Sequence, residues 1–362
     1  MEPKLSMSAE YGSNPNLSVT EPLSEYDGAV LLDLPTTYSA DRDSFSLLPR
    51  LRLGTAHSYA SYNSNYWYLD AVAATNRERF QGSLSAGASS DSTLHSGLEA
   101  VQIGKPNVRR DGREASANGQ YAVTEQLSAG ATGNWIRALF PAESGLESFD
   151  YTGGSLNVQY TLTPRLTLTA ELGDGRLRDL SGATNSTTQN WSVGGKYQLS
   201  QIWNLSLSGG YARESDRYYF PLYSTTESTL VAVYAATLGR EGERSTFAMN
   251  AGRSVQPTAF GVLALETLAS VTGSYRTSER WTVAASVQWS QSNSRVQPTV
   301  IEERTRVDSE LDVIWHWRPQ WDVILRGTRT NFRYQSQAID QMADSNGVYL
   351  LLTRAFGRRV FR

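Results

Sequence analysis

Apolar and polar residues alternate with a period of two along most of this chain. The clearest example is RWTVAASVQWSQ (280–291), in which Trp281, Val283, Ala285, Val287 and Trp289 alternate with smaller, mostly polar residues. Alternation with this period places the apolar side chains on one face of an extended strand. The segment therefore predicts a β-strand whose apolar face has a tryptophan at each end.

The same period recurs in LNVQYTL (156–162), LTLTAEL (166–172), WSVGGKYQL (191–199) and NLSLSGGYA (204–212), whereas helical periodicity is hard to find. Two kinds of connection separate such strands. Short polar turns occur at 39–43, 75–79, 123–126, 162–165, 199–203, 238–244, 276–280 and 317–321. Longer segments rich in Ser, Asn, Asp, Gly and Thr lie between them, among them 12–24, 139–149, 177–190, 214–226, 292–303 and 335–346.

These turns predict eighteen antiparallel strands, from 4–12 to 347–356, with both chain ends on the short-turn side. Sixteen strands are the alternative, because Pro35 and Pro49 disfavour the strands around them. A β-propeller is a poorer interpretation, since each blade needs four short strands. Tight turns at one end and long loops at the other are typical of outer-membrane barrels. We predict one domain over 1–362, a transmembrane, antiparallel, up-and-down β-barrel with short periplasmic turns and longer extracellular loops.

The spacing of the tryptophans fits a membrane. Trp281 and Trp289 are eight steps apart, or about 26 Å of strand, which spans most of an apolar band of about 25 Å when the strand is tilted. Aromatic residues gather at both margins of such a band. The alternative is the core of a soluble β protein, but repetition around the whole chain favours lipid. The predicted girdle aromatics are Tyr121, Trp135, Tyr160, Trp191, Tyr197, Trp203, Tyr211, Tyr275, Trp281, Trp289, Trp315, Trp317 and Trp321.

The opposite face of the strands is predicted to line a water-filled lumen. Its residues are polar and largely uncharged, and the charged ones carry both signs, which argues against strong ion selectivity. The predicted lumen-lining residues are Arg50, Arg52, Glu114, Asn118, Asn157, Gln159, Glu171, Lys196, Ser206, Ser286, Gln288, Arg306, Asp308 and Asp312.

Composition narrows the function classes. No apolar run approaches the ~18 residues of a transmembrane helix. The formal charge of −3, from 33 basic and 36 acidic residues, gives no indication of nucleic-acid binding. The chain has no cysteine. Since no signal peptide is visible after Met1, we expect a mature chain in the outer membrane of a Gram-negative cell, with its export signal already removed.

Catalytic or cofactor chemistry finds little support. The three histidines, His57, His95 and His316, are scattered without metal-ligand spacing. The charged segments 173–179 and 214–220 lie at predicted loop entrances, where charges are normally solvated. Phosphate-binding loops, dinucleotide fingerprints and EF-hands are missing from the sequence. We expect no enzyme activity, no metal and no cofactor.

Two segments resemble a known family. AEYGSNPNLS (9–18) is a strand that runs into an Asn-rich loop, and 83–135 combines a strand ending in DSTL, a long loop with Arg109, Arg110 and Arg113, and a strand-turn-strand. They resemble an outer-membrane β-barrel porin family associated with exopolysaccharide and capsule export in Gram-negative bacteria. The resemblance implies a conduit for a secreted polysaccharide that works with a periplasmic polysaccharide-export protein. The C-terminus departs from the usual terminal aromatic residue, since residues follow both Phe356 and Phe361.

Two other functions remain open. The first is a general diffusion porin or small-solute channel, although Ser90–Asp111, the longest candidate for a constriction loop, has no acidic cluster to face its arginines. The second is a structural barrel or adhesin with a plugged lumen, for which the sequence offers no plug domain. The polar lining is suited equally to a polysaccharide chain and to small solutes. It therefore does not discriminate between a polysaccharide conduit and a small-solute channel.

Overall fold

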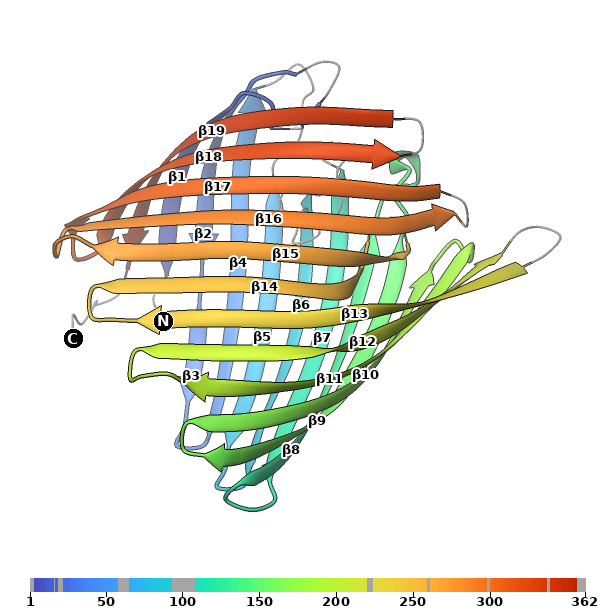
Figure 1. Cartoon of the computed structure of the whole chain (residues 1–362). Helices are drawn as coiled ribbons and strands as arrows, with labels where there is room; N and C mark the ends of the chain where they lie inside the picture. Colours follow the sequence, from blue (N-terminus) through green and yellow to red (C-terminus); the bar gives the residue numbers. More distant parts are fainter. Residues whose placement is uncertain are drawn as a thin grey trace.

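The strands form one antiparallel sheet that closes into a barrel (Figure 1). The computed structural model describes residues 3–15, 17–18, 22–57, 65–92, 108–219, 224–258, 261–297, 300–336 and 339–356. Apart from one interrupted strand, strands that are consecutive in the chain pair with each other, and β1 (Lys4–Gly12) pairs with both β2 (Glu25–Asp33) and β19 (Ile339–Ala355). This last pairing closes the sheet and removes the two edges that an open sheet would expose.

The other elements follow in chain order. They are β3 (Thr36–Ser39), β4 (Asp43–His57), β5 (Tyr66–Asn76), β6 (Phe80–Ser92), β7 (Arg109–Ala122), β8 (Leu127–Leu139), the 3-10 helix η2 (Ala142–Ser144), β9 (Phe149–Thr163), β10 (Leu166–Asp179), β11 (Thr184–Gln198), β12 (Trp203–Tyr219), β13 (Ser224–Glu241), β14 (Ser245–Pro257), β15 (Leu263–Arg276), β16 (Trp281–Gln297), β17 (Val300–Arg318) and β18 (Trp321–Ser336). Within the described ranges, no helix is long and apolar enough to cross a membrane.

The barrel has eighteen strands, because β2 and β3 are two parts of one interrupted strand. Both parts pair with β4, and the interruption falls at Leu34 and Pro35. Pro35 has no N–H to give to the ladder, whereas the Leu34 amide still donates to the Pro49 carbonyl oxygen at 3.0 Å. The prediction of eighteen strands is therefore confirmed, and sixteen is wrong. All eight predicted short turns join consecutive strands, and we call this end of the barrel the turn end.

At the other end, the loop end, the strands run further than the sequence predicted. Segments 177–190, 214–226, 292–303 and 335–346 were expected to be loops, yet the strand pairs β10–β11, β12–β13, β16–β17 and β18–β19 occupy most of each. The last strand accordingly begins at Ile339 and not at residue 347. The prediction took polar side chains as a sign of loops. Strand pairing uses only backbone hydrogen bonds, so a strand can continue where neither of its faces has to be apolar. The segment 139–149 does contain a connection, from Phe140 to Ser148, with η2 inside it.

Some predicted features lie outside the described residues. These are His95, Phe361 and residues 93–107 of the segment Ser90–Asp111. Arg109, Arg110 and Arg113, which were predicted to lie in a long loop, instead belong to β7 and pair with β6. The His57 backbone closes β4.

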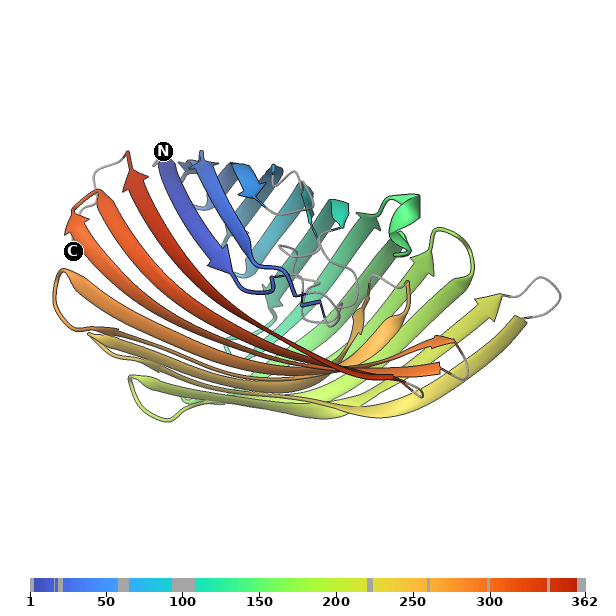
Figure 2. The ribbon, with the colours of Figure 1, turned by 90° about the horizontal axis from the view of Figure 1, so that it is seen from above.

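One hairpin departs from the cylindrical wall. β13 and β14 pair only between Tyr234–Arg253 and Glu241–Thr246, so β13 from Ser224 to Val233 has no neighbour on that side among the described strands. Beyond this point β14 and β15 bend toward the inside of the barrel (Figure 2). The wall therefore has a local split at the loop end.

Orientation in the membrane can be tested with single cysteines, because the chain contains none. We expect Ser181→Cys, in the connection between β10 and β11, to react with a membrane-impermeant maleimide on intact cells. Ser278→Cys, in the short turn between β15 and β16, should react only after lysis. Labelling of Ser278→Cys but not Ser181→Cys on intact cells would reverse the predicted orientation.

Candidate functional site

Cross-strand pairing sorts the side chains into two faces. Val287 pairs with Val271 and Ser309 on one face and is 50% exposed. The thirteen predicted girdle aromatics share this outer face, which also carries most of the exposed large apolar residues. At the turn end, Trp281 stacks on Trp315 with ring centroids 5.8 Å apart, and Trp317 and Trp321 continue the contact at 6.1 and 6.2 Å. Contact of these rings with lipid stays a prediction.

The fourteen predicted lumen residues all lie on the opposite, inner face. Ser286, for example, pairs with Thr272 and Glu310, one position out of phase with Val287. The same alternation places Arg50, Arg52, Glu114, Asn118, Asn157, Gln159, Glu171, Lys196, Ser206, Gln288, Arg306, Asp308 and Asp312 on this face. Their contact with a solute stays a prediction.

The structure joins part of this set into a network of ion pairs on β1–β7. Arg52 contacts Asp27 and lies 3.8 Å from Glu10, and Arg50 bonds Asp70 at 2.6 Å. Two neighbouring phenol rings stand beneath these guanidinium groups, with Arg50 5.0 Å from Tyr68 and Arg52 6.0 Å from Tyr66. Arg110 makes two bonds to Asp91, at 2.9 and 2.7 Å, and the Asp91 side chain is fully buried. Asp91 thus gives Arg110 a single carboxylate partner, while the predicted lack of an acidic cluster between Ser90 and Asp111 stays a prediction, since residues 93–107 lie outside the described ranges.

A second group of ion pairs lies on β17 and β18. Arg326 bonds both Asp312 oxygens at 2.8 Å and lies 3.2 Å from Glu310. Arg306 forms an ion pair with Asp308 at 2.6 Å, and Arg304 donates a hydrogen bond to Glu302 at 2.5 Å. His316 bonds Asp322 at 2.7 Å through Nδ1 and faces Thr282 at 3.3 Å through Nε2.

Barrel closure brings the two groups to the same side. Pairing of β1 with β19 places β17–β19 beside β1–β7, so the six arginines of these two groups share one arc of the inner wall. Arg50, Arg52 and Arg306 were predicted from the sequence to face the lumen, whereas Arg110, Arg304 and Arg326 were not. Alternation alone would have revealed Arg326, which follows the outward Leu325. Arg50, Arg52, Arg110 and Arg326 pair with an acid on another strand, and finding those partners needed the register, whereas Arg304 and Arg306 pair with acids two positions away on β17 itself.

The rest of the inner wall is mostly uncharged. Hydroxyl and amide groups bond across neighbouring strands, as between Thr132 and Ser155 at 2.8 Å and between Thr246 and Ser274 at 2.7 Å. Gln120 bonds Gln159 at 3.2 Å. Such groups offer weak, replaceable hydrogen bonds to water or to a hydroxylated solute.

The hairpin of β14 and β15 narrows the barrel at the loop end. Leu263 packs against Ala138, Phe149 and Leu177 on the inner face of β8, β9 and β10, and Phe149 and Leu177 are 0% exposed. These strands are not its neighbours in the sheet, so the hairpin reaches over the inside of the wall. The buried apolar contact holds it there.

Two carboxylates flank the tip of this hairpin. Gly261 has φ = +68°, and a Cβ atom there would lie 3.1 Å from Glu147 Cβ and 3.3 Å from Asp179 Cβ. Burial and, secondly, the Asp179 charge raise the pKa of the Glu147 carboxyl, which belongs to the connection between β8 and β9.

The raised pKa predicts a pH dependence of this contact. A carboxyl whose pKa is higher in the docked than in the released state binds its proton on docking. Docking should therefore strengthen as pH falls through the Glu147 pKa and weaken as pH rises above it. Single-channel conductance should fall on acidification, and Glu147→Gln should flatten this dependence. An unchanged pH profile in Glu147→Gln would remove Glu147 from the contact.

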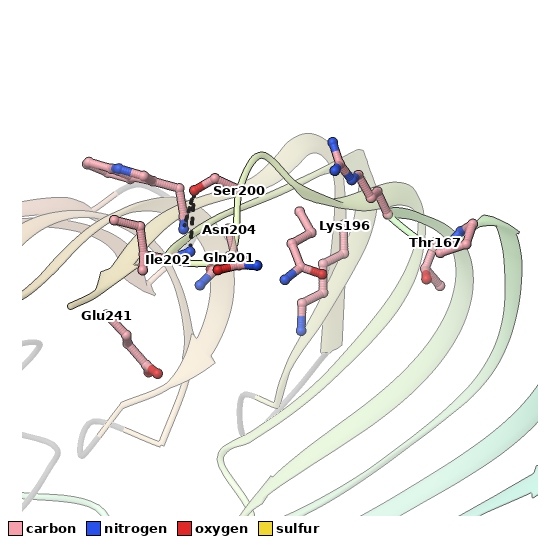
Figure 3. Close-up of a pocket in the computed structure, with 11 residues that line it drawn as sticks. Thr167, Lys196, Ser200, Gln201, Ile202, Asn204 and Glu241 are labelled. Carbon is pink, nitrogen blue, oxygen red and sulfur yellow. Dashed lines mark hydrogen bonds between the residues drawn. The ribbon is translucent and has the colours of Figure 1, made fainter. Parts of the chain in front are cut away.

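A polar pocket lies at the turn end, between the β9–β10 and β11–β12 turns. It has a volume of about 430 Å³, and Thr167, Lys196, Gln198, Asn204 and Glu241 are among its lining residues (Figure 3). The Ser200 hydroxyl accepts bonds from the Ile202 and Trp203 amides and fixes the second turn. Lys196 has no carboxylate partner among the described residues, unlike the six arginines of the arc.

Comparison with known proteins places the fold. Protein-family models and curated proteins gave no match. Among solved structures, OccK3 (OpdO) of Pseudomonas aeruginosa is similar with a TM-score of 0.51 and 16% identity, over 98% of this chain and 96% of the other. OccK2 (OpdF) of Pseudomonas aeruginosa in complex with glucuronate has a TM-score of 0.51 and 10% identity, over 98% of both chains. The chain thus has the fold of an 18-strand porin barrel of the Gram-negative outer membrane.

The same comparisons contradict polysaccharide export. Neither similar structure gives evidence of polysaccharide export, and the one solved with glucuronate holds a single sugar acid. The prediction of a polysaccharide conduit is therefore wrong, and the periplasmic export protein inferred with it has no support. The shared barrel pattern had produced the resemblance, since alternating strands and polar loops recur in barrels of many functions. The findings favour the small-solute alternative.

Proposed function

We propose that this barrel is a passive outer-membrane channel for small polar solutes, which favours neutral and cationic solutes over anions. The observation that carries the preference is the neutralised arginine arc. All six inner-face arginines of the arc have a carboxylate within 4 Å. A guanidinium that is already paired offers little attraction to a passing anion.

The remaining inner-face charges point the same way. Glu114, Glu171 and Glu266 are among the further carboxylates on this face, whereas Lys4, Lys196 and Arg276 add cations near the turn end. Rings of carboxylates favour cations in channels. The mostly uncharged rest of the inner wall supplies hydrogen bonds but no site that would bind a solute tightly. This suits a solute that has to leave as readily as it enters.

The test is the reversal potential of the purified barrel in a planar lipid bilayer under a KCl gradient. We expect weak cation selectivity. The double variant Glu310→Gln/Asp312→Asn leaves Arg326 without its partners and should shift the reversal potential toward chloride. Ser206→Asn, on the mostly uncharged rest of the inner wall, is the control and should leave the reversal potential unchanged. Anion selectivity of the unmodified barrel would contradict the proposal and would favour Lys196 and its pocket as the site that solutes meet.

A further inference from the structure

The outer face at the loop end of β7–β12 carries an excess of arginine. Its outward positions hold seven arginines and three aspartates, namely Arg109, Asp111, Arg113, Arg137, Asp150, Asp174, Arg176, Arg178, Arg213 and Arg217. Two of the arginines form ion pairs, Arg137 with Asp150 at 2.6 Å and Arg109 with Asp111 at 3.7 Å. The other five have no carboxylate partner among the described residues. We call this set of seven the arginine patch.

The register of the strands brings positive charges together in this patch. Arg113 lies directly opposite Arg137 in the β7–β8 pair, and like charges in that position repel. The same cross-strand row continues through Asp150 to Arg178 and through Asn185 to Arg217. One aspartate in the row cannot offset four guanidinium groups. An anion from outside the chain would stabilise the arrangement.

The patch lies at the level where the apolar band ends. Arg137 is two residues beyond Trp135, and Arg213 is two residues beyond Tyr211, each on the outer face and on the loop-end side of a predicted girdle aromatic. The guanidinium of Arg137 stands 5.6 Å from the Trp135 ring. Guanidinium groups just outside an aromatic girdle face the headgroups of the membrane.

Two apolar grooves lie beside the patch and cross the outer wall from β4 to β10. The first has a volume of about 600 Å³ and lies between Phe45, Leu84 and Trp135 over a floor of small residues that includes Ala117. The second, of about 810 Å³, lies between Leu156 and Leu172 and ends at Arg176. They share Thr152 and Gly153, so they lie next to each other. Grooves of this kind accept hydrocarbon chains.

We propose that the arginine patch and the two grooves form a binding site for a phosphorylated, multiply acylated lipid of the outer leaflet, of the lipopolysaccharide class. The phosphates would bond the arginines that lack an ion pair, since a guanidinium matches phosphate geometry with two parallel N–H donors. The acyl chains would fill the grooves below. The positive charge of the arginine patch distinguishes this site from ordinary lipid contact, because the grooves alone would accept any hydrocarbon chain.

The experiment counts bound lipid by native mass spectrometry of the purified full chain. The probes are hexa-acylated lipid A with both phosphates, the same lipid A after dephosphorylation, and phosphatidylglycerol. We expect the phosphorylated lipid A to bind most tightly. Arg113→Gln and Arg176→Gln should each weaken its binding about fivefold, as expected for one interfacial arginine. Arg329→Gln, an outward arginine on β18, is the matched control and should bind normally.

The grooves have their own pair of variants. Ala117→Trp fills the first groove and should reduce binding, whereas Ala129→Trp, outward on β8 but outside both grooves, should not. Heat-modifiable mobility on a gel shows that each variant folds. Equal binding of phosphorylated and dephosphorylated lipid A overturns the proposal, as does equal binding of phosphatidylglycerol. A loss in Arg329→Gln as large as that in Arg113→Gln also overturns it.

Discussion

Ala285→Arg is expected to destabilise the folded barrel by about 2–4 kcal/mol, as for an arginine on the lipid face near the bilayer midplane. Ala285 lies halfway between Trp281 and Trp289, and it faces outward between Gly273 and Leu311. An arginine there has to leave water for hydrocarbon or distort the bilayer around it. The measurement is the free energy of unfolding in urea, with the barrel folded into phospholipid vesicles and followed by tryptophan fluorescence.

The neighbouring position supplies the control for this substitution. Ser286 faces inward opposite Glu310, so Ser286→Arg should meet water and a carboxylate and cost far less. Equal losses in the two variants would mean that the inner and outer faces are assigned wrongly along β16. Larger loss in Ser286→Arg would mean that they are reversed.

Leu263→Asp is expected to release the hairpin of β14 and β15 from the inner wall and to raise the single-channel conductance. Leu263 is 2% exposed among Ala138, Phe149 and Leu177. Replacing it with a carboxylate removes the apolar contact and buries a charge, at a cost of about 3 kcal/mol or more. A change of that size shifts a two-state docking equilibrium by roughly a hundredfold. The barrel should still form, because the paired strands remain intact.

Gln256→Asp is the matched control, since it adds the same charge to an exposed position of the same hairpin. Its conductance should equal that of the unmodified barrel. If Leu263→Asp also leaves the conductance unchanged while the barrel folds, the hairpin does not narrow the path of ions. A rise in both variants would assign the effect to charge and not to release.

The number of strands could be predicted from the sequence because every strand of a membrane barrel obeys the same physical requirement. Each apolar face has to meet lipid, so alternation and girdle aromatics such as Trp281 and Trp289 mark both the strand and its facing. The short turns were equally clear, since Pro164 and similar residues interrupt the alternation abruptly. Strand ends at the loop end were not readable, because outside the membrane neither face has to be apolar.

The site was less accessible for a different reason. Alternation identifies which residues face inward but not which of them meet around the ring. Arg326 and Arg52 are far apart in the chain and share one arc only because β19 pairs with β1. The inward bend of β14 and β15 could not be predicted either, because it does not change the alternation of apolar and polar residues. The predicted function was wrong because it rested on a resemblance. The pattern shared with polysaccharide-export porins is common to outer-membrane barrels in general.

The split beside β13 gives the wall a weak line. Eight residue pairs join β13 to β14, whereas seventeen join β12 to β13. Local opening follows lines with few ladder hydrogen bonds. The β13–β14 line is therefore a seam along which the cylinder can open locally. We expect the backbone amides of Leu230–Val233 that point away from β12 to exchange with solvent before the amides of the fully paired strands.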